Sequence, residues 1–377
     1  MTTPSLPDAA VGLGARIGRY FSIVSLLPAL FLSSWTLALV MSGAWSGAPN
    51  LGRMVRGLTS INLGGVAWLL LATVVLALFL HPLQLAMTRL FEGYWGSSRL
   101  ATWLLRYRIT HHRKRIERIH RRKDRLEQRR NRILTKALVA RYLRELADDP
   151  STADDPAKWD PARWEDELED LLATPRAAAA SGAHAAVASI EHRLDKYPDP
   201  RRMMPTRLGN ALRTAEDSIG RQYSLDAIRA TPYIALIAPE THLNHLQDAR
   251  QQMDAAVRLC VVALLSALET FAFLVTDGWW LLISLGPYFL AYIAYRASVA
   301  AAEEYMGMVG TVLDLNRFKL YETFHVKLPR NTNEERRNNA KLMDLLAGDE
   351  DINLRYKHPA AGTPSTGAAP PTPPGTP

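Results

Sequence analysis

The hydropathy pattern divides the chain into long apolar runs and the charged stretches between them. Two apolar runs, residues 259–276 and 279–295, are separated only by Asp277 and Gly278. Each run is about as long as the roughly 17–25 residues that an α-helix needs to cross a bilayer. Because the connection is so short, the pattern predicts that both runs cross a membrane together as one hairpin.

A second hairpin is predicted nearer the N-terminus, from apolar runs at residues 20–41 and 63–80. The stretch between them, residues 42–62, is expected to be a short outer loop. The second run ends at Pro82, but apolar residues continue at helical spacing beyond it. Because a proline inside a helix usually bends it, we expect a bend at Pro82.

The distribution of basic residues predicts how these spans are oriented. Thirteen Lys and Arg residues fall within residues 106–132, directly after the first hairpin. Loops rich in Lys and Arg stay in the cytoplasm, so this stretch and both termini are expected there. Trp279 and Trp280 then lie at the outer edge, where aromatic side chains gather. The sequence therefore predicts a multi-pass protein of the cell (plasma) membrane with cytoplasmic N- and C-termini.

We therefore expect an all-α integral membrane protein with four transmembrane helices in two hairpins, separated by a helical cytoplasmic insert. The tail is expected to be disordered, because it is rich in proline and has no large apolar side chain. The predicted boundaries are a cytoplasmic N-terminal segment at 1–19, a first hairpin at 20–98, a helical insert at 99–254, a second hairpin at 255–297, a cytoplasmic helical region at 298–358 and the tail at 359–377.

The insert opens with a predicted long basic helix over residues 104–146. Apolar residues with seven-residue spacing form a narrow seam along it: Ile109, Ile116, Ile119, Leu126 and Ile133. Such a seam is compatible with a solvated charged helix and with a coiled-coil stem in an oligomer. The three histidines of this helix, His111, His112 and His120, are expected on its polar face.

Charge along the insert changes sign. Residues 106–132 have a net charge of +10 and residues 148–170 a net charge of −8. The densest basic cluster is a candidate for binding lipid headgroups or a partner protein. Nucleic-acid binding is disfavoured, because the position beside a predicted span already accounts for the basic charge. The cluster consists of Arg113, Lys114, Arg115, Arg118, Arg121, Arg122 and Lys123.

Glu269 is the candidate ion or proton site, because it lies well inside the third predicted span. A carboxyl group at that depth must be protonated, paired or in contact with a water-filled interior. The alternative is a structural, protonated carboxyl bonded to a nearby hydroxyl. Candidate partners are Thr270, Ser284, Thr73 and the hydroxyls of the first span.

Other chemistry finds little support in the sequence. His242 and His245, three residues apart and near Glu240 and Asp248, have the spacing of metal ligands but lack further ligands nearby. No motif of a hydrolase, metalloprotease, kinase or P-loop NTPase occurs. We expect no enzymatic activity, no cofactor and no metal. The single cysteine, Cys260, excludes a disulfide framework.

The most distinctive block reads MPTRLGN at residues 204–210, followed by AED at 215–217 and QYSLDA at 222–227. Thr206 is expected to cap the helix that follows it. This block, with the arrangement of the spans, resembles an uncharacterised family of multi-pass membrane proteins of actinobacteria and cyanobacteria. No activity is assigned to that family, so the resemblance implies a grouping and no site residues.

These observations lead to two hypotheses. The first is a non-enzymatic membrane protein that forms a homo-oligomer and a channel or ion or proton path near Glu269. Small residues spaced by four, Ala294, Ser298 and Ala302, would permit the close helix contacts that this requires. The alternative is a membrane-tethered scaffold or sensor whose cytoplasmic helices bind a partner protein.

Overall fold

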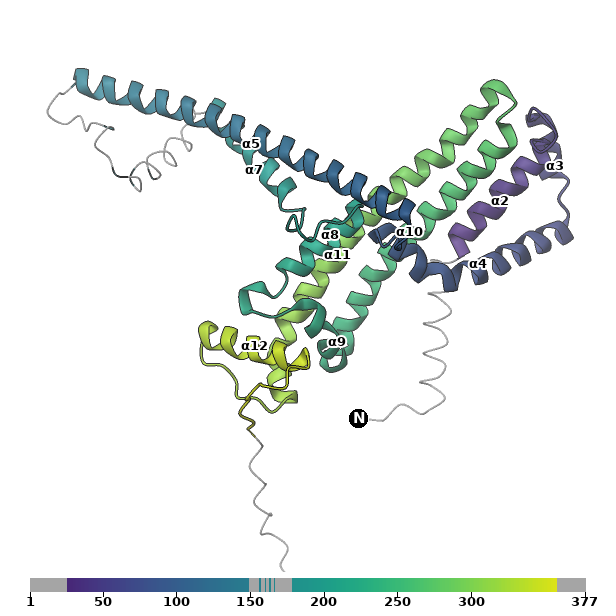
Figure 1. The fold of residues 1–377 in the computed structure, drawn as a ribbon. Helices are drawn as coiled ribbons and strands as arrows, with labels where there is room; N and C mark the ends of the chain where they lie inside the picture. Colours follow the sequence, from purple (N-terminus) through teal and green to yellow (C-terminus); the bar gives the residue numbers. More distant parts are fainter. Residues whose placement is uncertain are drawn as a thin grey trace, which may run out of the picture. The chain divides into compact units, whose positions relative to one another are not determined.

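The computed structural model describes residues 26–148 and 178–357, with the single positions Pro156, Asp160, Arg163 and Asp166. Across these residues the chain is helical, and its one β-pairing is an isolated bridge between Val326 and Tyr356. The elements (Figure 1) are α2 (Leu26–Ser42), α3 (Leu51–Thr59), α4 (Leu63–Glu92), α5 (Arg99–Asp148), α7 (Ala178–Leu194), α8 (Arg207–Ser218), the 3₁₀ helix η4 (Arg221–Tyr223), α9 (Ala227–Ile237), α10 (Glu240–Leu274), the 3₁₀ helix η5 (Gly278–Ser284), α11 (Leu285–Thr323) and α12 (Thr332–Leu346). The all-α class is therefore confirmed.

Within the described residues, three stretches are long and apolar enough to cross a membrane: α4, α10 and the η5–α11 stretch Gly278–Thr323. They contain three of the four predicted spans. The first predicted span corresponds to α2, whose described part has 17 residues. Its residues 20–25, the N-terminal segment at 1–19 and the tail at 359–377 lie outside the described residues.

Two boundaries differ from the sequence prediction. The predicted outer loop contains α3, which the side chain of Asn50 caps by accepting a hydrogen bond from the Arg53 amide. Gly52 and Gly57 weaken the helical signal of this short segment, so the sequence pattern missed it. The fourth predicted span begins as η5 and becomes α-helical only at Leu285. Pro287 lies in the first turn of α11, where its missing amide hydrogen costs no intrahelical bond.

The described residues fold into two compact units, those within 1–215 and 247–306 (unit 1) and those within 216–246 and 307–377 (unit 2). In unit 1, α10 is the central helix: 44% of the residues in its most apolar 18-residue stretch are buried, against 17% in the corresponding stretch of α4. Its small and aliphatic side chains pack against α2, α4 and α11 in three apolar clusters. These clusters contain Val262 with Ala29, Ala77 and Leu80; Cys260 and Ala263 with Ala291 and Ala294; and Leu274 with Leu39 and Ala44.

The MPTRLGN block connects α8 tightly to the end of α4. Thr206 caps α8 as predicted, accepting a hydrogen bond from the Gly209 amide, and its hydroxyl lies 3.0 Å from the Glu92 carbonyl oxygen. Asn210 bonds the amide and the carbonyl of Met204 through its side chain, which closes the preceding loop. A Cβ atom on Gly209 would lie 2.0 Å from the Glu92 carbonyl oxygen. The approach of the two helices therefore requires glycine at this position.

Helix α7 packs along the basic helix α5, so part of the length of α5 has a helical partner within the same chain (Figure 1). Lys123 of α5 and Glu191 of α7 form an ion pair of 2.7 Å across this contact. Leu134 and Leu138 are each only 2% exposed, and both lie near the predicted seam.

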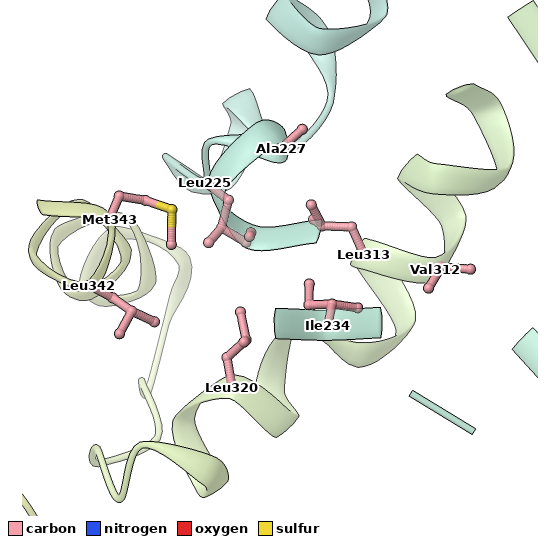
Figure 2. Close-up of a cluster of buried hydrophobic side chains, with 9 residues drawn as sticks. Leu225, Ala227, Ile234, Val312, Leu313, Leu320, Leu342 and Met343 are labelled. Carbon is pink, nitrogen blue, oxygen red and sulfur yellow. The ribbon is translucent and has the colours of Figure 1, made fainter. Parts of the chain in front are cut away.

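Unit 2 is held by an apolar cluster from α9, α11, α12 and the residue Leu225 before α9. In it Met343 of α12 lies beside Leu225, and Leu342 of α12 faces Leu320 of α11 (Figure 2). A polar chain continues this packing: the Tyr321 hydroxyl donates to Asn339 Oδ1, and Asn339 Nδ2 donates to the Tyr223 carbonyl. Buried polar groups that are paired in this way fix the register of the helices that carry them.

Replacing Gly209 by alanine should destabilise the protein by about 3 kcal/mol, because the new methyl group meets backbone that cannot move aside. The measurement is the thermal unfolding midpoint of the full chain in detergent, followed by circular dichroism. Gly182→Ala is the matched control, because nothing lies within 4 Å of its Cβ position and alanine favours the helix by about 0.5–1 kcal/mol. Equal midpoints for the two variants would contradict the packing assigned to Gly209.

Candidate functional site

Glu269 lies on α10 with its side chain half-buried against α2. Its carboxylate oxygen Oε2 accepts a hydrogen bond of 2.9 Å from the Thr36 hydroxyl. Thr36 is one of the first-span hydroxyls that the sequence suggests as partners. The three other named candidates, Thr270, Ser284 and Thr73, bond elsewhere.

Two further polar contacts tie α2 to its neighbours close to Glu269. The Trp35 indole donates to the Thr270 hydroxyl at 2.9 Å. The Ser33 and Thr73 hydroxyls lie 2.7 Å apart and join α2 to α4. In an apolar environment such bonds hold helices together, since water cannot replace them.

The Glu269 side chain lines a cavity of about 940 Å³, which lies between α2, α4 and α10. Of the described residues lining it, Glu269 alone is charged. The other lining groups include Ser33 and Thr36, and most of the rest are apolar side chains such as Leu32, Trp68 and Leu265. The Glu269 carboxyl group has one hydroxyl donor, Thr36, and otherwise faces the apolar side chains and the interior of the cavity. It can take up and release a proton, or attract a cation, where the cavity admits water.

Sequence reasoning missed a polar stripe on the buried face of α10. The stripe consists of polar residues spaced by four, interrupted once by Val262: Asp254, Arg258, Ser266 and Thr270. Each of the four is at most 8% exposed. Residues four apart share one helix face. The four-residue spacing could have indicated the stripe from sequence. The predicted span began after Arg258, however, and therefore divided the stripe into two parts.

Asp254 gives the stripe a second carboxyl group. It is buried, and the Thr88 hydroxyl of α4 lies 3.5 Å from its Oδ1 atom. Arg250 and Arg258 lie one turn away on either side of it along the same helix. A second protonatable side chain therefore stands on the same helix as Glu269, before the start of the predicted span.

The side chains of the predicted basic cluster on α5 lie in different environments. Lys123 pairs with Glu191, and Arg113 donates to the Pro200 carbonyl oxygen. Arg115 lines a cavity. The remaining four side chains, Lys114, Arg118, Arg121 and Arg122, are exposed. The cluster is thus not one continuous binding face, although its exposed part is strongly basic.

The histidines weighed in the sequence have structural surroundings. His242 Nδ1 is 3.0 Å from the Asn316 side-chain nitrogen, and no group of three potential metal ligands gathers in the part of the chain that the structure describes. His112 was expected on the polar face of α5, but it is 2% exposed. That expectation was wrong because the Tyr197 ring, 6.0 Å away, comes from far along the chain and covers it.

Comparison with protein-family models, with curated proteins and with solved structures finds no match to this chain. The candidate site therefore stands on its own geometry.

Acidification should destabilise the protein through His112. Burial, helped by the Arg108 charge, lowers the pKa of this imidazole from 6.5 to about 4. The folded state therefore favours the neutral ring, and its stabilisation is complete above pH 6.5 and is lost as the pH falls toward 4. The loss attributable to this group between pH 7 and pH 4 is about 3 kcal/mol.

The measurement compares the thermal unfolding midpoints of wild type and His112→Phe at pH 7 and pH 4. The variant should lose less stability on acidification, because phenylalanine cannot be protonated. His120→Phe is the control, since His120 is exposed on the same helix. An identical pH dependence in wild type and His112→Phe would refute the assignment.

Proposed function

We propose that this chain is a non-enzymatic multi-pass membrane protein that self-associates and provides an ion or proton path past Glu269. The observation that carries the proposal is the placement of Glu269: a half-buried carboxylate, bonded by Thr36, in the wall of an otherwise apolar cavity. Intramembrane carboxyl groups are costly to retain and commonly mark proton or ion pathways.

The polar stripe of α10 supports a path along this helix. From Asp254 to Thr270 the stripe covers 17 residues, and the 16 steps between its ends rise roughly 24 Å at 1.5 Å per residue. Because Asp254 and Arg258 precede the predicted span at 259–276, the stripe would lead from the cytoplasmic side into the membrane. Ions or protons passing along α10 would meet protonatable groups near both ends, Asp254 and Glu269.

The proposed topology has four spans in two hairpins within the plasma membrane, with the N- and C-termini in the cytoplasm. Apolar side chains on the outer faces of the helices support it: Leu63, Phe79 and Phe289 are 62–86% exposed. Such faces are unfavourable in water and favourable against lipid or a second copy of the chain.

Self-association would give the Glu269 cavity a complete wall. The cavity has α2, α4 and α10 around it, and a second copy on its open side would separate it from lipid. Small residues that permit close helix contact are present in α11, but Ala294, Ser298 and Ala302 are buried within one protomer. The contact between copies would therefore use the exposed apolar faces instead.

A scaffold or sensor function is the second candidate. The exposed basic side chains Lys114, Arg118, Arg121 and Arg122 favour it, because an exposed basic helix face attracts acidic proteins or anionic lipid. A soluble partner recovered with the full chain, and lost when these four residues are replaced by glutamine, would support this function.

Glu269→Gln should reduce cation or proton flux through reconstituted proteoliposomes at least about tenfold, because glutamine cannot bind a proton or carry charge. Thr36→Val should have a smaller effect, since the carboxyl group remains. Glu304→Gln is the control, because Glu304 is exposed on α11. Light scattering with the detergent mass subtracted establishes that each variant keeps the oligomeric state of the wild type.

Wild-type protein without flux, or flux that Glu269→Gln leaves unchanged, would contradict the path. A monomer in detergent would contradict self-association and favour the scaffold function.

Labelling of single cysteines tests the topology. In a Cys260→Ala background, Ser60→Cys should react with a membrane-impermeant maleimide added to intact cells, because it lies in the outer segment between α3 and α4. Asn131→Cys on α5 should react only after lysis. Both positions are exposed, so accessibility within the protein is matched, and the reverse labelling pattern would overturn the orientation.

A further inference from the structure

The Arg207 side chain takes no part in the joint that the rest of the MPTRLGN block forms. Thr206, Gly209 and Asn210 supply the cap, the close approach and the loop closure described above, and Leu208 is fully buried. Arg207 takes part through its backbone, whose amide donates to the Tyr295 hydroxyl at 3.1 Å. The residue also lines a second cavity of unit 1.

This cavity has a volume of about 450 Å³ and lies among α5, the end of α7, the start of α8, and α11. Each of these elements contributes at least one basic residue to its lining. Among the described residues, five basic residues line the cavity against one acidic residue, Glu303; the five are Arg115, Arg193, Lys196, Arg207 and Arg296.

The charges of the cavity are only partly balanced. Lys196 and Glu303 form an ion pair of 2.7 Å. The four arginines have no carboxylate partner in the described residues; Arg296 has only the Tyr292 hydroxyl, at 3.5 Å. Arg115 and Arg207 are half-buried, and Arg193 and Arg296 are exposed. Like charges gathered at one cavity repel one another, and an anion among them would relieve that repulsion.

The chemistry of the lining points to phosphate. Guanidinium groups bind phosphate oxygens through paired, charge-assisted hydrogen bonds, and several arginines from different helices can surround one phosphate group. The lining also includes the apolar residues Ile119, Ala211 and Val299. Such a wall suits a ligand that joins a phosphate group to an apolar or neutral part.

The position of the cavity favours a lipid as the source of that phosphate. Arg296 directly follows the fourth predicted span, and Tyr295, which holds the Arg207 amide, is the last residue of that span. Basic pockets at the cytoplasmic ends of membrane helices are suited to anionic lipid headgroups.

We propose that the cavity lined by Arg115, Arg193, Arg207 and Arg296 is a binding site for a phosphate group, supplied by an anionic phospholipid headgroup or by a soluble phosphate compound. This site differs from the exposed basic face of α5, with which it shares no residue once Arg115 is assigned to the cavity. It is also separate from Glu269, so it can exist whether or not the protein conducts ions.

The test measures binding of short-chain phosphatidylglycerol, short-chain phosphatidylcholine and inorganic phosphate to the full chain in a neutral detergent. Phosphatidylglycerol should bind more tightly than phosphatidylcholine. In the double variant Arg207→Gln/Arg296→Gln its affinity should fall at least about tenfold, because two charge-assisted contacts are lost. The control variant Arg129→Gln/Arg132→Gln removes equal charge from exposed positions of α5 outside the basic cluster and should stay within about twofold of wild type.

A further variant, Arg207→Lys/Arg296→Lys, keeps the charge and should recover part of the affinity, which separates loss of binding from loss of folding. Tight binding of the lipid with weak binding of inorganic phosphate supports the site with a lipid source. Saturation by inorganic phosphate that displaces the lipid supports it with a soluble source. Equal losses in the cavity and control variants, or unchanged binding in the cavity variant, would overturn the proposal.

Discussion

The buried polar stripe of α10 imposes the strongest constraint on unit 1. Asp254, Arg258, Ser266 and Thr270 all lie on the face that this helix turns toward its neighbours. A polar group removed from water costs free energy unless it is hydrogen-bonded. The helices around α10 supply polar partners at two matching heights: Trp35 of α2 donates to Thr270, and Thr88 of α4 lies beside Asp254. This requirement fixes the register of α2 and α4 more firmly than apolar packing alone, which tolerates sliding.

A second constraint operates where α4 ends. The carbonyl of Glu92 meets the Thr206 hydroxyl and leaves no space for a side chain at Gly209. The start of α8 is thereby fixed against the end of a membrane-length helix, and with it the position of Arg207. The cavity among α5, α7, α8 and α11 depends on this contact, because a shift of α8 would move one of its four arginines. The MPTRLGN block thus fixes the contact between α4 and α8, and its Arg207 side chain lines the cavity.

The sequence predicted what depends on local pattern and missed what depends on distant contacts. The helical class, three membrane-length helices and the Thr206 cap follow from apolar run length and capping chemistry, which neighbouring residues determine. The burial of His112 could not be predicted, because Tyr197 and Pro205 reach it from 85 or more positions further along the chain. The same holds for the arginine cavity, since only Arg115 and none of its other basic groups lay in the predicted cluster. Glu269 was found from composition alone, but the choice among its possible hydroxyl partners required the structure.

The bond between Thr36 and Glu269 has a consequence for the order of synthesis. The two residues are separated by 233 positions, so a ribosome adding roughly 5–20 residues per second needs roughly 10–50 s between them. During that interval Thr36 and Trp35 have no α10 to bond, whereas Ser33 has its partner Thr73 only 40 positions away. Helices α2 and α4 can therefore pair through Ser33 and Thr73 before α10 exists, whereas the bonds of Trp35 and Thr36 to α10 form only after α10 is made.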